Sequence, residues 1–218
     1  MTKIYLISPP KIDLAEFSKS LEAALKTRLV PVFQLRLKDY SEEEVKTIAL
    51  ELQKICKANN CLFIVNDSYE LAVAIGADGV HLGADDGSIQ IVKEKSLKDF
   101  AGKDFVIGAS CYDSKHLAME AGEQGADYIS FGAFFPSKTK VSRGNPTLET
   151  VEWCNELIEL PIVVIGGITD ENCAPLVQAG ADFLAVISHV WDNPEGVERA
   201  ICNLDEAIIS NTPDPITN

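Results

Sequence analysis

The chain has 218 residues, of which 46 % are hydrophobic and 24 % charged, and its formal net charge is −14. This length and balance indicate a soluble globular protein with one large domain or two small ones. The acidity argues against a nucleic-acid partner, which would be bound largely through Lys and Arg, but allows a small anion in a locally basic pocket. Since no apolar run approaches the roughly 20 residues that a membrane helix needs, we expect no membrane partner.

The N-terminus and the cysteines indicate the compartment. The first residues enter a strand-like segment directly, without a signal-peptide pattern, which predicts a cytoplasmic protein. Six cysteines are scattered without any Cys-x-x-Cys pair, so we expect reduced, mostly buried thiols. A homo-oligomer is compatible with this composition, although no sequence feature specifies one.

Short apolar runs alternate with amphipathic segments along the whole chain. The predicted strands cover residues 3–8, 31–37, 62–66, 79–82, 105–109, 128–132, 162–166 and 183–187. The predicted helices cover residues 14–26, 41–58, 68–75, 88–95, 114–122, 147–157, 169–179 and 195–209. Ser41 and Glu44 have the spacing of a capping box at the start of the second helix. Residues 210–218 are predicted to form a flexible tail.

The phrase Gly-Ala-Asp occurs three times, beginning at Gly76, Gly125 and Gly180, and each copy follows a predicted helix. Glycine is the usual helix stop, so the phrase indicates a turn from a helix into a strand. Eight strands alternating with eight helices predict a single-domain (β/α)8 TIM barrel with parallel strands over residues 1–209. A doubly wound open sheet is the competing fold, but no Gly-x-Gly-x-x-Gly follows the first strand.

In such a barrel the carboxyl ends of the strands meet at one mouth, where the chemistry is placed. Gln34, Arg36 and Lys38 alternate with apolar residues along the second predicted strand, so they should share a face that climbs into this mouth. The residues that follow the other strands add neutral donors and one further cation. These are Asn66, Ser110, Ser137, Thr139 and Lys140.

Two more features of the mouth fit phosphate chemistry. Asp67 and Asp86 are carboxylates on adjacent loops, and together with the oxygens of a diphosphate they can hold Mg²⁺ while the cations take the remaining charge. Gly166-Gly167 and Ile187-Ser188 follow the seventh and eighth strands, the usual position of a barrel phosphate site.

Seven ordered blocks of this sequence carry a resemblance to a known family. The blocks are QLRLKD (34–39), VND (65–67), GVHLGADD (79–86), IGAS (107–110), DYISFGAFFPSKTK (127–140), VVIGGI (163–168) and GADFLAVIS (180–188). The chain resembles thiamine-phosphate synthases and their relatives, the thiazole tautomerases, whose fold is a (β/α)8 barrel. The resemblance implies a Mg²⁺-dependent transfer of hydroxymethylpyrimidine from its diphosphate to a thiazole phosphate, which yields thiamine phosphate and pyrophosphate.

The resemblance also implies roles for individual residues. The diphosphate would be held by Arg36, Lys38, Asn66, Ser110 and Lys140. Asp67 and Asp86 would bind Mg²⁺, and Gln34 would contact the pyrimidine. The thiazole phosphate would be held by Ser137, Thr139, Gly167, Ile187 and Ser188. In this mechanism the amino group of the pyrimidine expels pyrophosphate, and the thiazole nitrogen attacks the resulting cation, so the site needs fixed positive charge rather than a nucleophile.

Two departures from the family pattern keep alternatives open. Ala84 stands where many relatives have Gln, and Cys111-Tyr112 stands where many have x-His, the position of the tautomerase histidine. A thiazole tautomerase and a non-catalytic barrel that binds thiamine precursors are therefore alternatives, although the retained cations and carboxylates favour the transferase. His81, which ends the fourth strand, is interpreted as a structural histidine near the barrel top.

Overall fold

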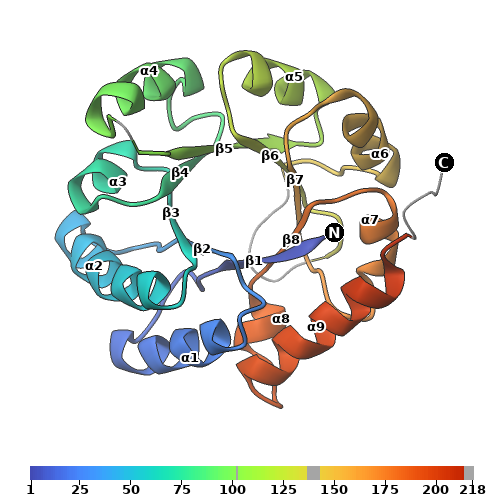
Figure 1. The fold of residues 1–218 in the computed structure, drawn as a ribbon, viewed down its shortest axis with the longest axis horizontal. Coiled ribbons are helices and arrows are strands. Elements are labelled where there is room, and N and C mark those ends of the chain that lie inside the picture. The colour runs from blue at the N-terminus through green and yellow to red at the C-terminus, as the bar shows by residue number, and fades with distance from the viewer. Residues whose placement is uncertain (102, 137–142, 214–218) are drawn as a thin grey trace.

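The computed structural model describes residues 1–101, 103–136 and 143–213. Its parallel strands close into a barrel in sequence order, and β8 pairs with β1 (Figure 1). The strands are β1 (Lys3–Ile7), β2 (Val32–Leu35), β3 (Leu62–Asn66), β4 (Gly79–Leu82), β5 (Val106–Tyr112), β6 (Tyr128–Gly132), β7 (Ile162–Ile165) and β8 (Phe183–Val186). The predicted barrel is thus confirmed, and the open sheet is excluded.

The helices surround the barrel (Figure 1). They are α1 (Leu14–Lys26), α2 (Glu42–Ala58), α3 (Tyr69–Ile75), α4 (Ile89–Asp99), α5 (Lys115–Glu123), α6 (Leu148–Leu157), α7 (Ala174–Gln178), α8 (Ser188–Trp191) and α9 (Val197–Asn211). Four of them begin at a serine whose side chain accepts a backbone N–H of the first turn, and the predicted capping box of Ser41 and Glu44 is present. None of the described helices is both long and apolar enough to cross a membrane.

Several predicted helix boundaries are wrong. α4 continues four residues past the predicted end, and the helix predicted over 169–179 shortens to α7 because the Asn172 side chain accepts the N–H of Thr169 and holds a turn there. α8 was not predicted. α9 continues through Asn211, two residues into the predicted tail, and residues 214–218 of that tail lie outside the described part of the chain.

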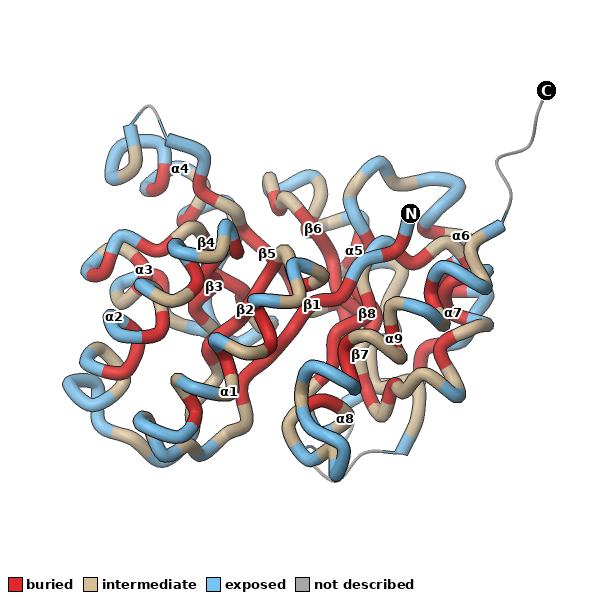
Figure 2. Tube along the Cα trace, turned by 60° about the horizontal axis from the view of Figure 1, so that its bottom comes forward, coloured by how far each residue is buried: buried red, intermediate tan, exposed pale blue. Residues whose placement is uncertain are grey.

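Side chains of successive strand residues alternate between the barrel interior and the surrounding helices, as the pleat requires. Figure 2 shows the strands as a buried centre and the helices with exposed outer faces. The interior contains a separate small cluster: Tyr5, Ile7, Val32, Ile64, Tyr128, Val163 and Ala185. The larger core lies between the strands and the helices. Alternation therefore decides which residues can reach a site inside the barrel.

The three Gly-Ala-Asp phrases are helix-to-strand turns, as predicted. Their glycines have φ values of +63°, +93° and +94°, a region that disfavours residues with a Cβ. The Asp78 carboxylate accepts the backbone N–H of Phe63 at 2.8 Å. Asp127 and Asp182 make the equivalent 2.8 Å bonds to the strand that precedes each of them. Each turn therefore leads from a helix into a strand, and its aspartate hydrogen-bonds that turn to the neighbouring strand. The strand pairs connected in this way are β3 with β4, β5 with β6 and β7 with β8.

Candidate active site

A cavity of about 730 Å³ opens at the carboxyl ends of the strands. The predicted site residues that line it are Gln34, Arg36, Lys38, Asn66, Asp67, Asp86, Ser110, Gly167, Ile187 and Ser188. The remaining predicted residues, Ser137, Thr139 and Lys140, lie outside the described residues. Every predicted site residue that the structure describes thus faces one cavity.

The cations of the cavity wall, Arg36 and Lys38, lie in the segment directly after β2. The strand ends at Leu35, so the prediction that it continues through Leu37 is wrong. The chain instead runs beside the segment after β1, because the N–H of Arg36 donates to the Ser8 hydroxyl at 2.8 Å and the N–H of Lys38 donates to the Pro10 carbonyl at 2.9 Å.

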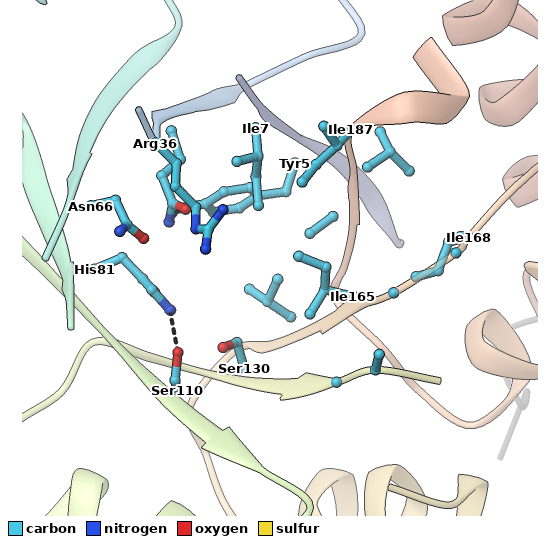
Figure 3. A pocket seen from close by; sticks show the side chains of 18 of the residues that line it. Tyr5, Ile7, Arg36, Asn66, His81, Ser110, Ser130, Ile165, Ile168 and Ile187 are labelled. Atoms are coloured by element: carbon cyan, nitrogen blue, oxygen red, sulfur yellow. Dashed lines mark hydrogen bonds between the residues drawn. The ribbon is translucent and has the colours of Figure 1, made fainter. Parts of the chain in front are cut away.

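The guanidinium of Arg36 points into the cavity beside Asn66 (Figure 3). Among the described residues no carboxylate forms an ion pair with Arg36 or Lys38, whereas many surface lysines have one. Cations that converge on a concave surface without a protein counter-ion create a positive potential that attracts anions. This side of the cavity is therefore suited to an anionic ligand.

The carboxylates of the cavity wall lie in the loops after β3 and β4. Asp67 has a φ of +66°, and its N–H donates to the His81 carbonyl at 2.8 Å. Asp86 accepts the N–H of Gly83 at 2.8 Å through one carboxylate oxygen. Asp85 pairs instead with Arg143 at 2.7 Å.

These carboxylates are suited to one kind of metal. Three or more His, Cys, Asp or Glu side chains do not gather into a metal-binding group anywhere in the described ranges. Mg²⁺ is commonly held by one or two carboxylates together with water and substrate phosphates rather than by a complete protein cage. Asp67 and Asp86 on one cavity wall therefore fit Mg²⁺ that is shared with a phosphorylated ligand.

The opposite wall presents backbone N–H groups. Gly167, Ile168, Ser188 and His189 line this wall, and their backbone N–H groups have no acceptor among the described residues. Gly167 has a φ of +62°, and a Cβ there would lie 2.5 Å from the Pro136 carbonyl oxygen, so only glycine fits this turn. Backbone N–H groups without an internal acceptor can bind an anion, so this wall is suited to a second anionic group.

A chain of hydrogen bonds crosses the barrel along residues that line the cavity. Gln34 Nε2 donates to the Tyr5 hydroxyl at 3.0 Å, and the Tyr5 and Tyr128 hydroxyls are 2.8 Å apart. His81 Nδ1 lies 2.9 Å from the Tyr128 hydroxyl, and His81 Nε2 lies 2.9 Å from Ser110 Oγ. Burial raises the pKa of Tyr5 and of Tyr128 well above the usual value, so both phenols keep their protons. We refer to these five residues as the hydroxyl chain.

Sequence reasoning missed Tyr5 and Tyr128, because a tyrosine in a buried strand resembles ordinary core. The available signal was their position in the strand alternation, since both occupy positions whose side chains point into the barrel. His81, predicted to be structural, is indeed buried, but it also lines the cavity.

Two departures from the family pattern lie beside each other. The N–H of Ala84 points at the Tyr112 hydroxyl, 3.4 Å away, and Arg143 also approaches this hydroxyl at 3.4 Å. Cys111 is buried outside the barrel wall, and burial raises the pKa of its thiol to about 12. Tyr112, not an imidazole, therefore occupies this part of the cavity wall.

Comparison with known proteins identifies the family. The model of the thiamine monophosphate synthase family matches residues 4–190. Thiamine-phosphate synthase of Erythrobacter litoralis is 49 % identical over 199 residues, which cover 89 % of this chain and 90 % of the relative. The enzyme of Rhodospirillum centenum is 42 % identical over 206 residues, covering 94 % and 97 %. A solved thiamine phosphate pyrophosphorylase from Pyrococcus furiosus has a TM-score of 0.80 and 31 % identity, and covers 97 % of each chain. The chain belongs to the thiamine monophosphate synthase family.

Proposed function

We propose that this protein is a Mg²⁺-dependent thiamine-phosphate synthase, which transfers hydroxymethylpyrimidine from its diphosphate to a thiazole phosphate and releases pyrophosphate. One observation carries the proposal. Arg36 and Lys38 face the same cavity as Asp67 and Asp86, and the two cations have no acidic partner among the described residues. That arrangement is expected of a site that receives a polyanion together with a divalent cation.

The leaving pyrophosphate would lie at this end of the cavity. Arg36 and Lys38 supply fixed positive charge, while Asn66 and Ser110 supply neutral donors; by family resemblance Lys140 adds a third cation. Donors placed where negative charge develops stabilise the transition state more than the ground state, because they are already oriented when the bond breaks. Asp67 and Asp86 would hold Mg²⁺, which, when bound, offsets further charge on the phosphate oxygens.

The two organic substrates would meet in the middle of the cavity. Gln34 reaches its floor and would contact the pyrimidine. The N–H groups at Gly167 and Ser188 would bind the thiazole phosphate, with Ile187 beside them and Ser137 and Thr139 added by family resemblance. This arrangement would hold the thiazole nitrogen in line with the methylene carbon that loses pyrophosphate, and such alignment lowers the entropy cost of bringing two reactants together.

The chemistry explains why no nucleophilic side chain is needed. The amino group of the pyrimidine donates electron density as the carbon–oxygen bond to pyrophosphate breaks, which leaves a delocalised cation. The lone pair of the thiazole nitrogen then forms the new carbon–nitrogen bond. The substrates supply every electron pair, and the protein supplies orientation and positive charge. Both substrates are small anions. From the N-terminal sequence we place the reaction in the cytoplasm.

The test is an assay with purified protein, both substrates and Mg²⁺. We expect pyrophosphate and thiamine phosphate in equal amounts. Asp67→Asn should raise the Mg²⁺ concentration for half-maximal rate by about tenfold or more, since even changes to the partners of metal ligands typically cost that much. Asp85→Asn is the matched control, because Asp85 pairs with Arg143, and it should leave the Mg²⁺ dependence near that of the wild type.

Other outcomes would overturn the proposal. Tight binding of both substrates without pyrophosphate release would indicate a binding protein. Conversion of one thiazole phosphate tautomer into another, without the pyrimidine substrate, would indicate an isomerase.

A further inference from the structure

We propose that His81 is a positioning residue for the leaving-group site. The hydroxyl chain has a fixed donor direction, running from Gln34 to Ser110, and it holds the Ser110 hydroxyl as a donor toward the departing diphosphate. The inference rests on the proposed function, because it takes Ser110 as a ligand of pyrophosphate. It adds three residues, Tyr5, Tyr128 and His81, that need not touch the diphosphate themselves.

The direction follows from the first bond of the chain, in which the amide nitrogen of Gln34 and not its oxygen faces Tyr5. The opposite orientation of this amide would reverse every bond of the chain. Gln34 Nε2 can only donate, so the Tyr5 oxygen accepts and the Tyr5 hydrogen is left for Tyr128. The Tyr128 hydrogen then points at His81 Nδ1, which must be an acceptor. A neutral imidazole with an acceptor at Nδ1 carries its hydrogen at Nε2, and this hydrogen points at Ser110 Oγ. Ser110 accepts, and its own hydrogen remains available to the cavity.

The opposite direction fails at Tyr5. If Tyr128 donated to Tyr5, the Tyr5 oxygen would accept from two sides, and its own hydrogen would have no acceptor. Tyr5 is 2 % exposed, so water does not replace the missing partner. A doubly protonated His81 fails in the same way, because it would force Tyr128 to donate to Tyr5. Buried donors without acceptors are rare in folded proteins, so with Gln34 Nε2 facing Tyr5 the first direction is the one that satisfies every member of the chain.

Packing fixes the central member of the chain. The Tyr128 ring stacks on the His81 ring with centroids 5.5 Å apart and an interplanar angle of 24°. It occupies space that only a glycine at position 108 leaves open, because a Cβ there would collide with the phenol. The close fit of the Tyr128 ring against Gly108 and His81 keeps its hydroxyl between Tyr5 and His81.

The consequence lies at Ser110. An unrestrained serine hydroxyl rotates and can present either its hydrogen or a lone pair to a ligand. A lone pair facing pyrophosphate would repel it. Because His81 donates to Ser110 Oγ, the hydroxyl hydrogen turns toward the cavity, where the Arg36 guanidinium also points (Figure 3). The fixed direction of the chain thereby orients a neutral donor before substrate arrives, and this preorganisation is what stabilises developing charge.

Nuclear magnetic resonance tests the direction itself. The chain contains three histidines, so the ring nitrogens of His81 can be assigned by comparison with a His81→Gln variant. We expect the spectrum of the free protein to show hydrogen on Nε2 and a bare Nδ1. Hydrogen on Nδ1, or on both nitrogens, would overturn the inference whatever the protein catalyses.

Binding of pyrophosphate with Mg²⁺, measured by calorimetry, tests the consequence. Tyr128→Phe removes the donor to His81 without touching Ser110, and it should weaken binding about fivefold, the usual effect of one hydrogen bond. In a Ser110→Ala background the same change should have almost no further effect, because residues that act through one another are not additive. His81→Leu should weaken binding more than His81→Gln, which keeps a donor near Ser110.

The controls separate this inference from the proposed function. Tyr69→Phe removes a hydroxyl that bonds Asp99 outside the barrel, and it should not change pyrophosphate affinity. Equal weakening by Tyr128→Phe with and without Ser110 would show that Tyr128 acts independently and would refute the hydroxyl chain. If Ser110→Ala itself leaves pyrophosphate affinity unchanged, the proposed ligand is wrong, and the failure belongs to the proposed function.

Discussion

At the scale of single residues, His189 combines burial with a missing hydrogen bond. It lies in α8, at the amide-lined wall of the cavity, and its Nε2 is buried without a hydrogen-bond partner among the described residues. Asp170 Oδ1 is 3.6 Å from this nitrogen, too far for a hydrogen bond. Burial lowers the pKa of His189, while Asp170, the backbone of Ala200 and Glu171 raise it by a smaller amount. The folded protein therefore favours the neutral imidazole.

That shift predicts how stability depends on pH. The unfolded chain binds the proton more readily than the folded chain, so the contribution of His189 to the free energy of unfolding is complete above about pH 6.5 and is lost as the pH falls toward the lower, folded-state pKa. Urea unfolding between pH 7.5 and pH 5 should show a flatter decline for His189→Gln than for the wild type. The exposed His116→Gln is the matched control. Parallel declines for all three proteins would contradict the assignment.

At the scale of elements, the Gly-Ala-Asp turns connect neighbouring strands. Each turn ends a helix with a glycine at positive φ and then uses an aspartate to accept an N–H of the preceding strand. A backbone N–H at the start of a barrel strand has no other acceptor there, and leaving it unsatisfied is costly. The repeated phrase is thus a stabilising device rather than part of the site.

Asp78 allows a clean test of that device. Asp78→Ala leaves the N–H of Phe63 without its acceptor and should lower the free energy of unfolding by about 2 kcal/mol, the usual range for a hydrogen bond to a charged group. Asp78→Asn keeps an acceptor oxygen and should lose clearly less. Both values can be read from urea unfolding curves. Equal losses for the two variants would show that the charge or the packing matters rather than the hydrogen bond.

The same scale shows what sequence patterns can and cannot predict. Serine caps and positive-φ glycines are local signals, so most helix starts and all three turns were predicted correctly. The end of β2 depends on Ser8 and Pro10, which are distant in sequence, and no local pattern marks it. α8 is a single turn whose Trp191 indole donates to the Ile7 carbonyl at 2.7 Å, again a long-range contact.

At the scale of the whole molecule, closure of the barrel turns a list of strand ends into one site. Residues as far apart as Arg36 and Ser188 share a cavity because every parallel strand delivers its carboxyl end to the same mouth. Charged and polar residues after each strand could therefore be predicted from topology alone. The hydroxyl chain could be predicted only in part, because Gln34 and Ser110 were expected at the site, whereas the bonds that connect them through Tyr5, Tyr128 and His81 depend on the three-dimensional packing.

The rate of pyrophosphate release tests the central claim most directly, that the cations of this cavity stabilise the leaving group. With both substrates and Mg²⁺ saturating, Arg36→Ala should lower kcat by about 10²–10³, the usual cost of removing one preorganised donor. Arg199→Ala, which removes an exposed cation of α9, should release pyrophosphate at the wild-type rate. A kcat for Arg36→Ala within about twofold of the wild type would contradict the account.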